Sequence, residues 1–298
     1  MENILEVRGL CKRYPSFALE NVAFSLPAGS IMGFIGENGA GKTTTLKLIL
    51  NEARRDAGEI RVFGKDNLRD EIAVKKQLGV VFDESYFYDE LTAGDVGKIL
   101  RRVFKTWDQP LFEKYLREFG LPQKKNIKEY SKGMKMKLSI ASAISHHPRL
   151  LILDEATSGL DPVVRSDILD LFLDFIQDEG CSVLFSSHIT TDLERVADYV
   201  TFLHKGRVVF SRPKDELIDR CGIVKCGASR FPSLDKSGFL RWREGGAECE
   251  ALVADKDEAR RKYTGLVVDG ASLDEIMLLY VKGESSVTLH PAHRRAGM

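Results

Sequence analysis

The chain of 298 residues has little of several features that mark particular classes of protein. Its five cysteines are scattered, odd in number and without C-x-x-C spacing, which argues against both a disulfide framework and a zinc knuckle. No stretch approaches the roughly 18 apolar residues that a membrane-spanning helix needs, and the N-terminus lacks the basic and apolar segments of a secretion signal. We therefore expect a cytoplasmic, soluble chain in which any membrane role depends on a separate subunit.

The charge balance argues against another group of functions. The chain carries 44 Lys and Arg residues and 44 Asp and Glu residues, so its formal net charge is zero. The sequence therefore gives no sign of the basic surface that is typical of nucleic-acid binding or of attraction to a membrane surface. The length suits one large α/β domain with a smaller one, because single cores rarely grow past about 250 to 300 residues.

The most informative stretch of the sequence is a glycine-rich loop. Residues 36–44 are G-E-N-G-A-G-K-T-T and directly follow the apolar run 31–35. A strand followed by G-x-x-x-x-G-K-[ST] and a helix is typical of a loop that binds a nucleoside triphosphate, because curled backbone amides and the helix N-terminus attract phosphates. The residues predicted to contact the nucleotide are Gly36, Asn38, Gly39, Ala40, Gly41, Lys42, Thr43 and Thr44. The alternative is an ordinary glycine-rich turn between a strand and a helix.

Two carboxylates end a second buried strand. The apolar run L-L-I-L at 150–153 is followed by Asp154 and Glu155. Carboxylates at the end of such a strand are expected at the carboxyl edge of a parallel sheet. Lys42 is expected to reach the β- and γ-phosphates, while Thr43 and Asp154 bind Mg²⁺. Glu155 is expected to orient or deprotonate the attacking water. A buried strand that ends at a solvated acidic turn is the alternative interpretation.

The remaining pattern predicts layers around this core. Alternating apolar and polar residues at 4–10 and 18–26 predict an antiparallel β layer. Tyr14 lies between these segments, where it could stack on a base, although a packed or surface tyrosine is the alternative. Apolar residues at helical spacing predict an inserted helical subdomain between about 91 and 127. The expected core stripes of its helices are Val96, Ile99, Leu100, Val103 and Phe104, then Leu111, Phe112, Tyr115, Leu116 and Phe119.

A resemblance to a known family emerges between the two phosphate motifs. Residues 130–134 are Y-S-K-G-M, in the place where ATP-binding subunits of ABC transporters carry the signature L-S-G-G-Q. Together with the phosphate motifs, the chain resembles this family from about residue 2 to 215. Ser131 and Gly133 match the signature, whereas Lys132 and Met134 depart from it. Alone, S-K-G predicts no more than a helix cap; the resemblance implies that Ser131 and Gly133 bind the γ-phosphate of ATP held mainly by a second subunit.

The resemblance continues beyond the signature. Residues 158–161, S-G-L-D, match the family's D-loop at the dimer seam, and His188 stands where the family has a switch histidine that contacts the γ-phosphate. Without the family, His188 is an ordinary solvated histidine; with it, Tyr14 is expected to stack on adenine. Asp83 replaces the family's glutamine, which contacts Mg²⁺ and links to the membrane subunit. A carboxylate can still bind Mg²⁺ but cannot donate a hydrogen bond, so we expect Asp83 to tune metal affinity or closure.

These expectations define the predicted architecture. The fold class is α/β, with a P-loop NTPase core on a parallel sheet, an N-terminal antiparallel β layer, an inserted helical subdomain and a small α+β C-terminal extension. The predicted boundaries are 1–218 for the ATP-binding domain, with its helical subdomain at about 85–148, then 219–283 for the accessory domain and 284–298 for a flexible tail. In the accessory domain we expect strands at 251–254 and 266–269 and a helix at 272–280. This domain resembles, less specifically, the extension found in subunits paired with ABC-2-type exporters.

The resemblance implies a function as well as a fold. It implies a homodimeric ATPase that binds two ATP molecules with Mg²⁺ and drives a separate transmembrane permease for export, peripheral on the inner face of the cell membrane and without nucleic acid. Lys42, Glu155 and His188 are the expected catalytic residues. The alternative is a soluble member of the superfamily that acts on a macromolecular assembly without a permease. An adenylate-kinase-like or GTPase protein fits less well, because neither class predicts the helical insert followed by S-K-G and then D-E.

Overall fold

The computed structural model describes residues 2–83, 86–178 and 180–285. The chain divides into two compact units, Met1–Arg212 and Pro213–Met298. The division therefore falls at 212/213, where the sequence predicted 218/219, because the helix α8 (Lys214–Arg220) belongs to the second unit and approaches its strand β14 (Val267–Gly270). The predicted tail at 284–298 lies outside the described residues from 286 onward.

The core of the first unit is a six-stranded sheet in the order β10-β9-β3-β8-β7-β6. Its strands from β9 to β6 pair in parallel, and every residue of β3, β7 and β8 is buried. Parallel strands covered on both faces need continuous apolar runs, which is the pattern that the sequence offers at these positions. The strands are β3 (Ile31–Ile35), β6 (Leu78–Val81), β7 (Leu150–Asp154), β8 (Ser182–Ser187), β9 (Tyr199–His204) and β10 (Arg207–Pro213).

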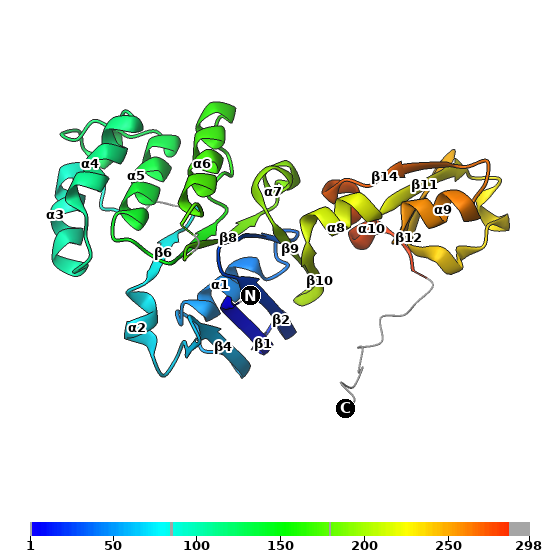
Figure 1. Ribbon diagram of the computed structural model, residues 1–298, viewed down its shortest axis with the longest axis horizontal. Helices are drawn as coiled ribbons and strands as arrows, with labels where there is room; N and C mark the ends of the chain where they lie inside the picture. Colours follow the sequence, from blue (N-terminus) through cyan, green and yellow to red (C-terminus); the bar gives the residue numbers. More distant parts are fainter. Residues whose placement is uncertain (1, 84–85, 179, 286–298) are drawn as a thin grey trace. The chain divides into compact units, whose positions relative to one another are not determined.

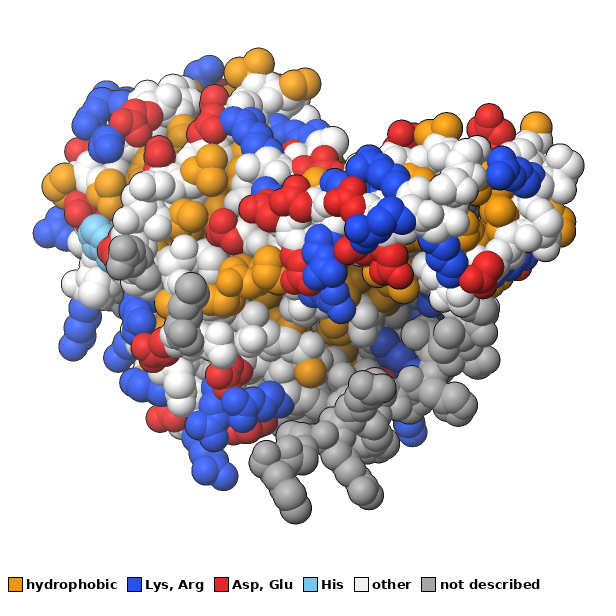
Figure 2. Space-filling view, turned by 45° about the vertical axis from the view of Figure 1, so that its right-hand side comes forward, with side chains coloured by type: hydrophobic (Ala, Val, Ile, Leu, Met, Phe, Trp, Pro, Cys, Tyr) orange, Lys and Arg blue, Asp and Glu red, His pale blue; other side chains and the backbone are white. Residues whose placement is uncertain are grey.

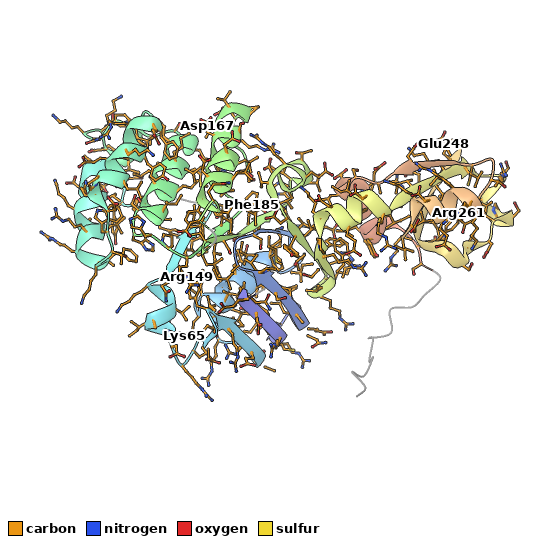
Figure 3. The ribbon with its side chains drawn as sticks, in the orientation of Figure 1. Lys65, Arg149, Asp167, Phe185, Glu248 and Arg261 are labelled. Carbon is orange, nitrogen blue, oxygen red and sulfur yellow. The ribbon has the colours of Figure 1, made fainter. Side chains whose placement is uncertain are left out.

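An antiparallel sheet, ordered β2-β1-β4-β5, packs against this core. Its strands are β1 (Asn3–Tyr14), β2 (Phe17–Pro27), β4 (Ala57–Val62) and β5 (Lys65–Asp66). Leu5, Leu10 and Val22 point into one cluster with Phe34 and Leu184 of the parallel sheet. The guanidinium of Arg149, labelled in Figure 3, also lies 4.9 Å from the ring centroid of Phe63, at the end of β4. The two sheets thus share one hydrophobic core below the phosphate loop.

Helices surround the parallel sheet and form a separate cluster beyond it (Figure 1). They are α1 (Lys42–Ile49), α2 (Glu71–Lys75), α3 (Ala93–Val103), α4 (Gln109–Glu118), α5 (Lys132–Ile144), α6 (Pro162–Phe175) and α7 (Thr190–Val196). Figure 3 labels Phe185 of β8, whose ring meets Phe172 of α6 with 5.4 Å between centroids. The start of α6 follows from its sequence, because Asp161 accepts hydrogen bonds from the backbone N–H groups of Val163 and Val164.

The helices α3, α4 and α5 share a core of their own, built around Phe112, Leu116 and Leu138. Only some residues of the stripe predicted for α3 belong to this core, because Ile99 is 46% exposed and Val103 is 64% exposed. The expectation that both form helix core is therefore wrong. The helix begins at a capping box, in which the Thr92 hydroxyl accepts from the Asp95 N–H, and it turns Val96 toward α4 and α5.

The second unit is a four-stranded antiparallel sheet, ordered β12-β13-β11-β14, with helices. Its elements are α8, β11 (Gly222–Gly227), β12 (Phe239–Gly245), β13 (Glu248–Val253), α9 (Lys256–Lys262), β14 and α10 (Leu273–Lys282). Phe231, Phe239 and Trp242 dominate a core that also takes in Tyr263 after α9. The α+β character matches the prediction, whereas β11 and β12 are strands that the sequence did not predict.

The surface of the molecule carries charges of both signs. Figure 2 shows basic and acidic side chains interspersed over the visible face, in keeping with a formal net charge of zero. Among the described helices, none combines the length and the apolar character needed to cross a membrane.

Candidate active site

A cavity of about 570 Å³ lies where β3 opens into α1 and where β7 and β8 end. It gathers the phosphate loop with residues that are distant in the sequence. The residues that line it are Ser16, Phe17, Glu37, Asn38, Gly39, Gly41, Lys42, Thr43, Thr44, Asp83, Glu155, Ser158 and His188. Most of the residues that the sequence analysis nominated for nucleotide binding and catalysis thus line the same cavity.

The phosphate loop depends on glycine at two positions. Gly41 has φ +110°, and a Cβ there would lie 2.6 Å from the Leu19 side chain and 2.7 Å from the Phe17 ring. A Cβ at Gly36 would lie 2.4 Å from the Leu203 carbonyl oxygen. A side chain at Gly36 would therefore collide with backbone, and one at Gly41 would both strain the backbone and push Leu19 and Phe17 aside. The helix α1 begins directly after the loop, and its first three residues, Lys42, Thr43 and Thr44, line the cavity.

Lys42, Glu155 and His188 form a chain of polar contacts. The buried Lys42 ammonium donates to the Gly36 carbonyl at 2.8 Å and lies 3.1 Å from Glu155 Oε1. The other oxygen of Glu155, Oε2, lies 2.6 Å from Nδ1 of His188, which is half-exposed. One carboxylate is thus held between the lysine of the glycine-rich loop and a histidine. This arrangement can position a water molecule and a phosphate oxygen beside each other.

Asp154 occupies a buried position behind this carboxylate. The Ser186 hydroxyl donates to Asp154 Oδ1 at 2.5 Å, and the Glu155 N–H donates to the Ser186 carbonyl at 3.1 Å. Glu155 itself has φ +53°, a left-handed conformation that costs a non-glycine residue about 1 to 2 kcal/mol. Such backbone strain is concentrated at functional sites, where the surrounding bonds hold it in place. Here Ser186 fixes the directions in which the two adjacent carboxylates point.

Several nominated residues do not line the cavity. Asp154 lies behind Glu155, and Gly36 and Ala40 form the buried inner side of the loop. Ser131 and Gly133 lie at the start of α5, where the Ser131 hydroxyl accepts from the Met134 N–H at 3.2 Å as a helix N-cap. The signature turn therefore does not complete the cavity of its own chain.

The wall of the nucleotide cavity also contains an aromatic residue that the sequence analysis did not nominate. Phe17 lines the cavity and packs against Gly41. Tyr14 lies directly opposite Phe17 across the β1–β2 turn, is 40% exposed and does not line the cavity. Phe17 follows the turn of Pro15 and Ser16 as the first residue of β2, and such a position gives no sequence signal that its side chain will face the phosphate loop.

The two aromatic residues are expected to act differently on ATP. Tyr14→Ala should raise the Kd for ATP about tenfold or more while leaving inorganic tripolyphosphate unaffected, because an exposed ring that stacks on a base contributes about 1 to 3 kcal/mol. Phe17→Ala should weaken both ligands by the same factor, since this ring supports the phosphate loop. Isothermal titration of each variant with both ligands checks this. Equal weakening of both ligands by Tyr14→Ala would contradict a stacking role.

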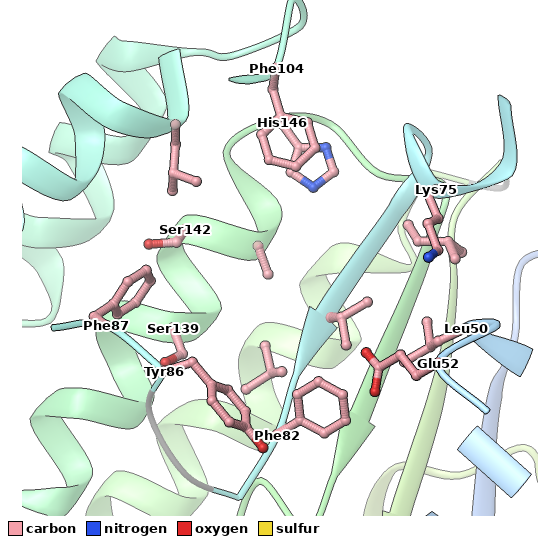
Figure 4. A pocket seen from close by; sticks show the side chains of 15 residues that line it. Leu50, Glu52, Lys75, Phe82, Tyr86, Phe87, Phe104, Ser139, Ser142 and His146 are labelled. Atoms are coloured by element: carbon pink, nitrogen blue, oxygen red, sulfur yellow. The ribbon is translucent and has the colours of Figure 1, made fainter. Parts of the chain in front are cut away.

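A second cavity, of about 430 Å³, lies between β6 and the helices α3 and α5. Figure 4 shows Phe104 and His146 together at one end and Phe82 with Tyr86 at the other. The rings of Phe104 and His146 are stacked with 4.0 Å between centroids. Two buried polar atoms from the described part of this wall, Ser142 Oγ and His146 Nδ1, have no hydrogen-bond partner. The groove is thus mainly apolar with a small polar part.

The stability of the protein is expected to fall in mild acid because of His146. Burial lowers the pKa of this imidazole to about 4, whereas an unfolded histidine titrates near its usual 6.5. The unfolded chain therefore binds a proton that the folded chain excludes, so stability is retained above about pH 6.5 and lost as the pH falls toward 4. We expect a loss of about 2 kcal/mol at this site between pH 7 and 5. Urea unfolding of wild type and His146→Phe measures it; parallel pH profiles would contradict the assignment.

The fold and the site together define a class of protein. A parallel sheet, a glycine-rich loop that opens into α1, and two strand-end carboxylates of which one contacts the loop lysine are the marks of a P-loop nucleoside triphosphatase.

Comparison with known proteins agrees with this class and narrows it. A family profile described as ABC transporter matches residues 19–158. The bacitracin transport ATP-binding protein BcrA of Bacillus licheniformis is 32% identical over 74% of this chain and 73% of its own length. The lantibiotic transport ATP-binding protein SrtF of Streptococcus pyogenes is 31% identical over 71% of this chain and 92% of its own.

A solved structure described as the ATP-binding subunit of an ABC transporter aligns with a TM-score of 0.66 and 30% identity, over 72% of this chain and 92% of that one. The chain belongs to the ABC transporter ATP-binding proteins. It is therefore an ATP-binding and ATP-hydrolysing subunit, and the predicted fold class and family are confirmed.

Proposed function

We propose that the chain works as a homodimer that binds two ATP molecules between its copies, closes on them, and opens after hydrolysis. The observation that supports this arrangement is the position of the signature turn. Ser131 and Gly133 lie at the N-terminus of α5, outside the cavity that Lys42 and Glu155 line. In a second copy, this helix start supplies the amides and the hydroxyl that complete the ATP site. ATP then favours the closed state through the contacts that it makes only there.

The residues around the cavity have different roles in ATP binding and hydrolysis. Lys42 binds the β- and γ-phosphates, Gly39, Gly41 and the helix N-terminus supply backbone N–H groups, and Tyr14 supports the base. Glu155 positions the attacking water and takes up its proton. His188 holds Glu155 through the 2.6 Å contact and reaches the γ-phosphate. Phosphoryl transfer depends mainly on such positioning, since the protein forms no covalent intermediate.

The donor set also suits Mg²⁺. This ion prefers oxygen ligands and is usually bound by one or two carboxylates together with substrate phosphates. Thr43 and Asp83 line the cavity, and Asp154 lies behind it with a hydroxyl hydrogen-bonded to one oxygen. These three residues would hold the ion, whose charge would offset that of the phosphates. Asp83 differs from the family's glutamine in adding a negative charge, so we infer that it tunes metal affinity or closure.

We assign the apolar groove beside β6 to a separate transmembrane permease. Its occupant in this proposal is a short amphipathic helix of the permease that presents apolar side chains and a hydrogen-bond donor. In the groove, Phe82, Phe87 and Leu100 would pack against the apolar side chains of that helix. The unpaired His146 Nδ1 would accept a hydrogen bond from its donor. Asp83, in the nucleotide cavity, directly follows Phe82, so the groove and the ATP site share one short segment. The chain would then be peripheral on the inner face of the cell membrane.

Export is the direction that we propose for this transporter. Its support is the resemblance of the C-terminal unit to extensions of exporter subunits, together with relatives named for bacitracin and lantibiotic transport. A peptide cargo is compatible with those names, and the permease selects it.

The groove assignment is tested by paired variants on α3. Leu100→Glu places a charge in the groove, whereas Ile99→Glu places the same charge on the exposed side of the helix. We expect Leu100→Glu to lower recovery of a co-purifying membrane protein by about 30-fold, the effect of losing an interface hot spot, with both variants keeping wild-type ATPase rates. Equal recovery with both variants would contradict the groove as the docking site.

A further inference from the structure

Lys132, which replaces a glycine of the family signature, connects two turns of the first unit. It is the first residue of α5, and its ammonium donates to the Ser158 carbonyl at 2.8 Å. Ser158 belongs to the turn between β7 and α6. A Cβ built on Gly159, which has φ +69°, would lie 3.0 Å from Lys132 Nζ. Glycine at 159 thus gives the lysine room to reach the backbone of this turn.

The turn that Lys132 holds also carries the catalytic carboxylate. The Ser158 N–H donates to the Glu155 carbonyl at 3.0 Å, and both residues line the nucleotide cavity. Glu155 in turn contacts Lys42 and His188. A continuous series of contacts therefore runs from the signature turn to the catalytic carboxylate of the same chain.

Two other contacts between α5 and α6 are of another kind. A Cβ at Gly133 would lie 3.3 Å from Val164 Cγ1, and Lys137 pairs at 2.9 Å with Asp167, which Figure 3 labels on α6. These contacts join the sides of two helices and fix how the helices pack. The bond from Lys132 instead reaches the backbone of the loop before α6, the loop that also carries Glu155.

We propose that Lys132 is a positioning residue that couples the two ATP sites of the dimer. The inference rests on the proposed dimer, in which Ser131 and Gly133 of one copy meet the γ-phosphate of ATP bound to the other. The Lys132 ammonium then has two acceptors within reach, the Ser158 carbonyl and that phosphate. The phosphate oxygens carry a negative charge that the Ser158 carbonyl lacks, so attraction between opposite charges makes the phosphate the stronger acceptor, and ATP in the partner draws the lysine from Ser158. The turn that carries Glu155 therefore changes its position only when ATP occupies the partner's site.

This coupling predicts cooperative hydrolysis that depends on Lys132. Wild type is expected to show a Hill coefficient for ATP that approaches two, the number of sites, and Lys132→Met a clearly lower value, which reflects only the coupling that closure of the dimer itself provides. The half-saturating ATP concentration of Lys132→Met should rise about tenfold or more, because a hydrogen bond with a charged partner is lost. Lys132→Arg keeps a donor of the same charge and should restore cooperativity.

Steady-state ATPase rates across ATP concentrations test the proposal on wild type, both Lys132 variants and Lys135→Met. Lys135 lies on the same helix and pairs with Asp89, so its loss controls for removal of a charge. Thermal unfolding should be alike for all four, since Lys132 is exposed. Unchanged cooperativity and half-saturation in Lys132→Met would overturn the coupling, as would a wild type that hydrolyses ATP without cooperativity. A wild type that hydrolyses no ATP would instead overturn the proposed function itself.

Discussion

Lys42→Ala is expected to abolish nearly all ATP hydrolysis. The Lys42 ammonium is buried at the base of the phosphate loop, 2.8 Å from the Gly36 carbonyl and 3.1 Å from Glu155. Alanine removes the cation that offsets charge on the β- and γ-phosphates, and the loss of one such preorganised donor lowers kcat about 100- to 1000-fold. ATP affinity should fall as well, because the same contact exists before the reaction.

Two controls make this result specific to the site. Lys47→Ala removes an exposed lysine at the last turn of the same helix and should leave hydrolysis unchanged. Lys42→Ala also leaves the partly buried Glu155 without its cationic neighbour, so the free energy of unfolding of this variant must be measured alongside. A folded Lys42→Ala protein that hydrolyses ATP within tenfold of wild type would contradict the role given to Lys42.

Glu155→Gln is expected to separate ATP binding from hydrolysis. The amide keeps the shape of the side chain but cannot take a proton from water, and loss of a general base lowers kcat about 100- to 10,000-fold. Binding should persist or tighten, because one negative charge beside the triphosphate is removed. With ATP unhydrolysed, the closed dimer should accumulate, and size-exclusion chromatography with light scattering measures its mass with and without ATP.

Glu37→Gln is the matched control for this variant. Glu37 is a carboxylate of the same cavity whose side chain lies 3.2 Å from His204, and Lys42 reaches its backbone carbonyl at 3.5 Å, a contact that glutamine keeps. The Glu37→Gln protein should hydrolyse ATP at the wild-type rate, and its closed dimer should not accumulate with ATP. A Glu155→Gln protein that turns over ATP at the wild-type rate would exclude Glu155 as the residue that positions water.

The core elements could be predicted from the sequence because burial on both faces of a parallel sheet requires continuous apolar runs. The segments 31–35 and 150–154 are such runs, and each is followed by a motif whose chemistry depends on the end of a strand. The strands β11 and β12 were missed because polar residues interrupt them, as in G-I-V-K-C-G and F-L-R-W-R-E-G. Ile99 and Val103 follow helical spacing, yet periodicity cannot tell an apolar face that packs from one that is exposed.

The chemistry of the site was easier to predict than its geometry. The two phosphate motifs predicted Lys42 and Glu155 in one site, and the family resemblance added His188; in the structure the three side chains contact one another in sequence. The left-handed backbone of Glu155 and its support from Ser186 depend on tertiary hydrogen bonds that no local pattern encodes. The contact between Lys132 and Ser158 likewise joins residues 26 positions apart in the sequence.

The central claim is that this ATPase drives a permease, and co-purification from membranes tests it most directly. The tagged chain is expressed in its native cell, gently solubilised from membranes, and recovered with and without ATP, with Glu155→Gln in parallel. The account predicts a polytopic membrane protein in near-stoichiometric amount, retained by wild type and by Glu155→Gln. Recovery only from the soluble fraction, together with ribosomes, DNA or assembly factors, would contradict the transporter assignment and support an ATPase that acts on a macromolecular assembly.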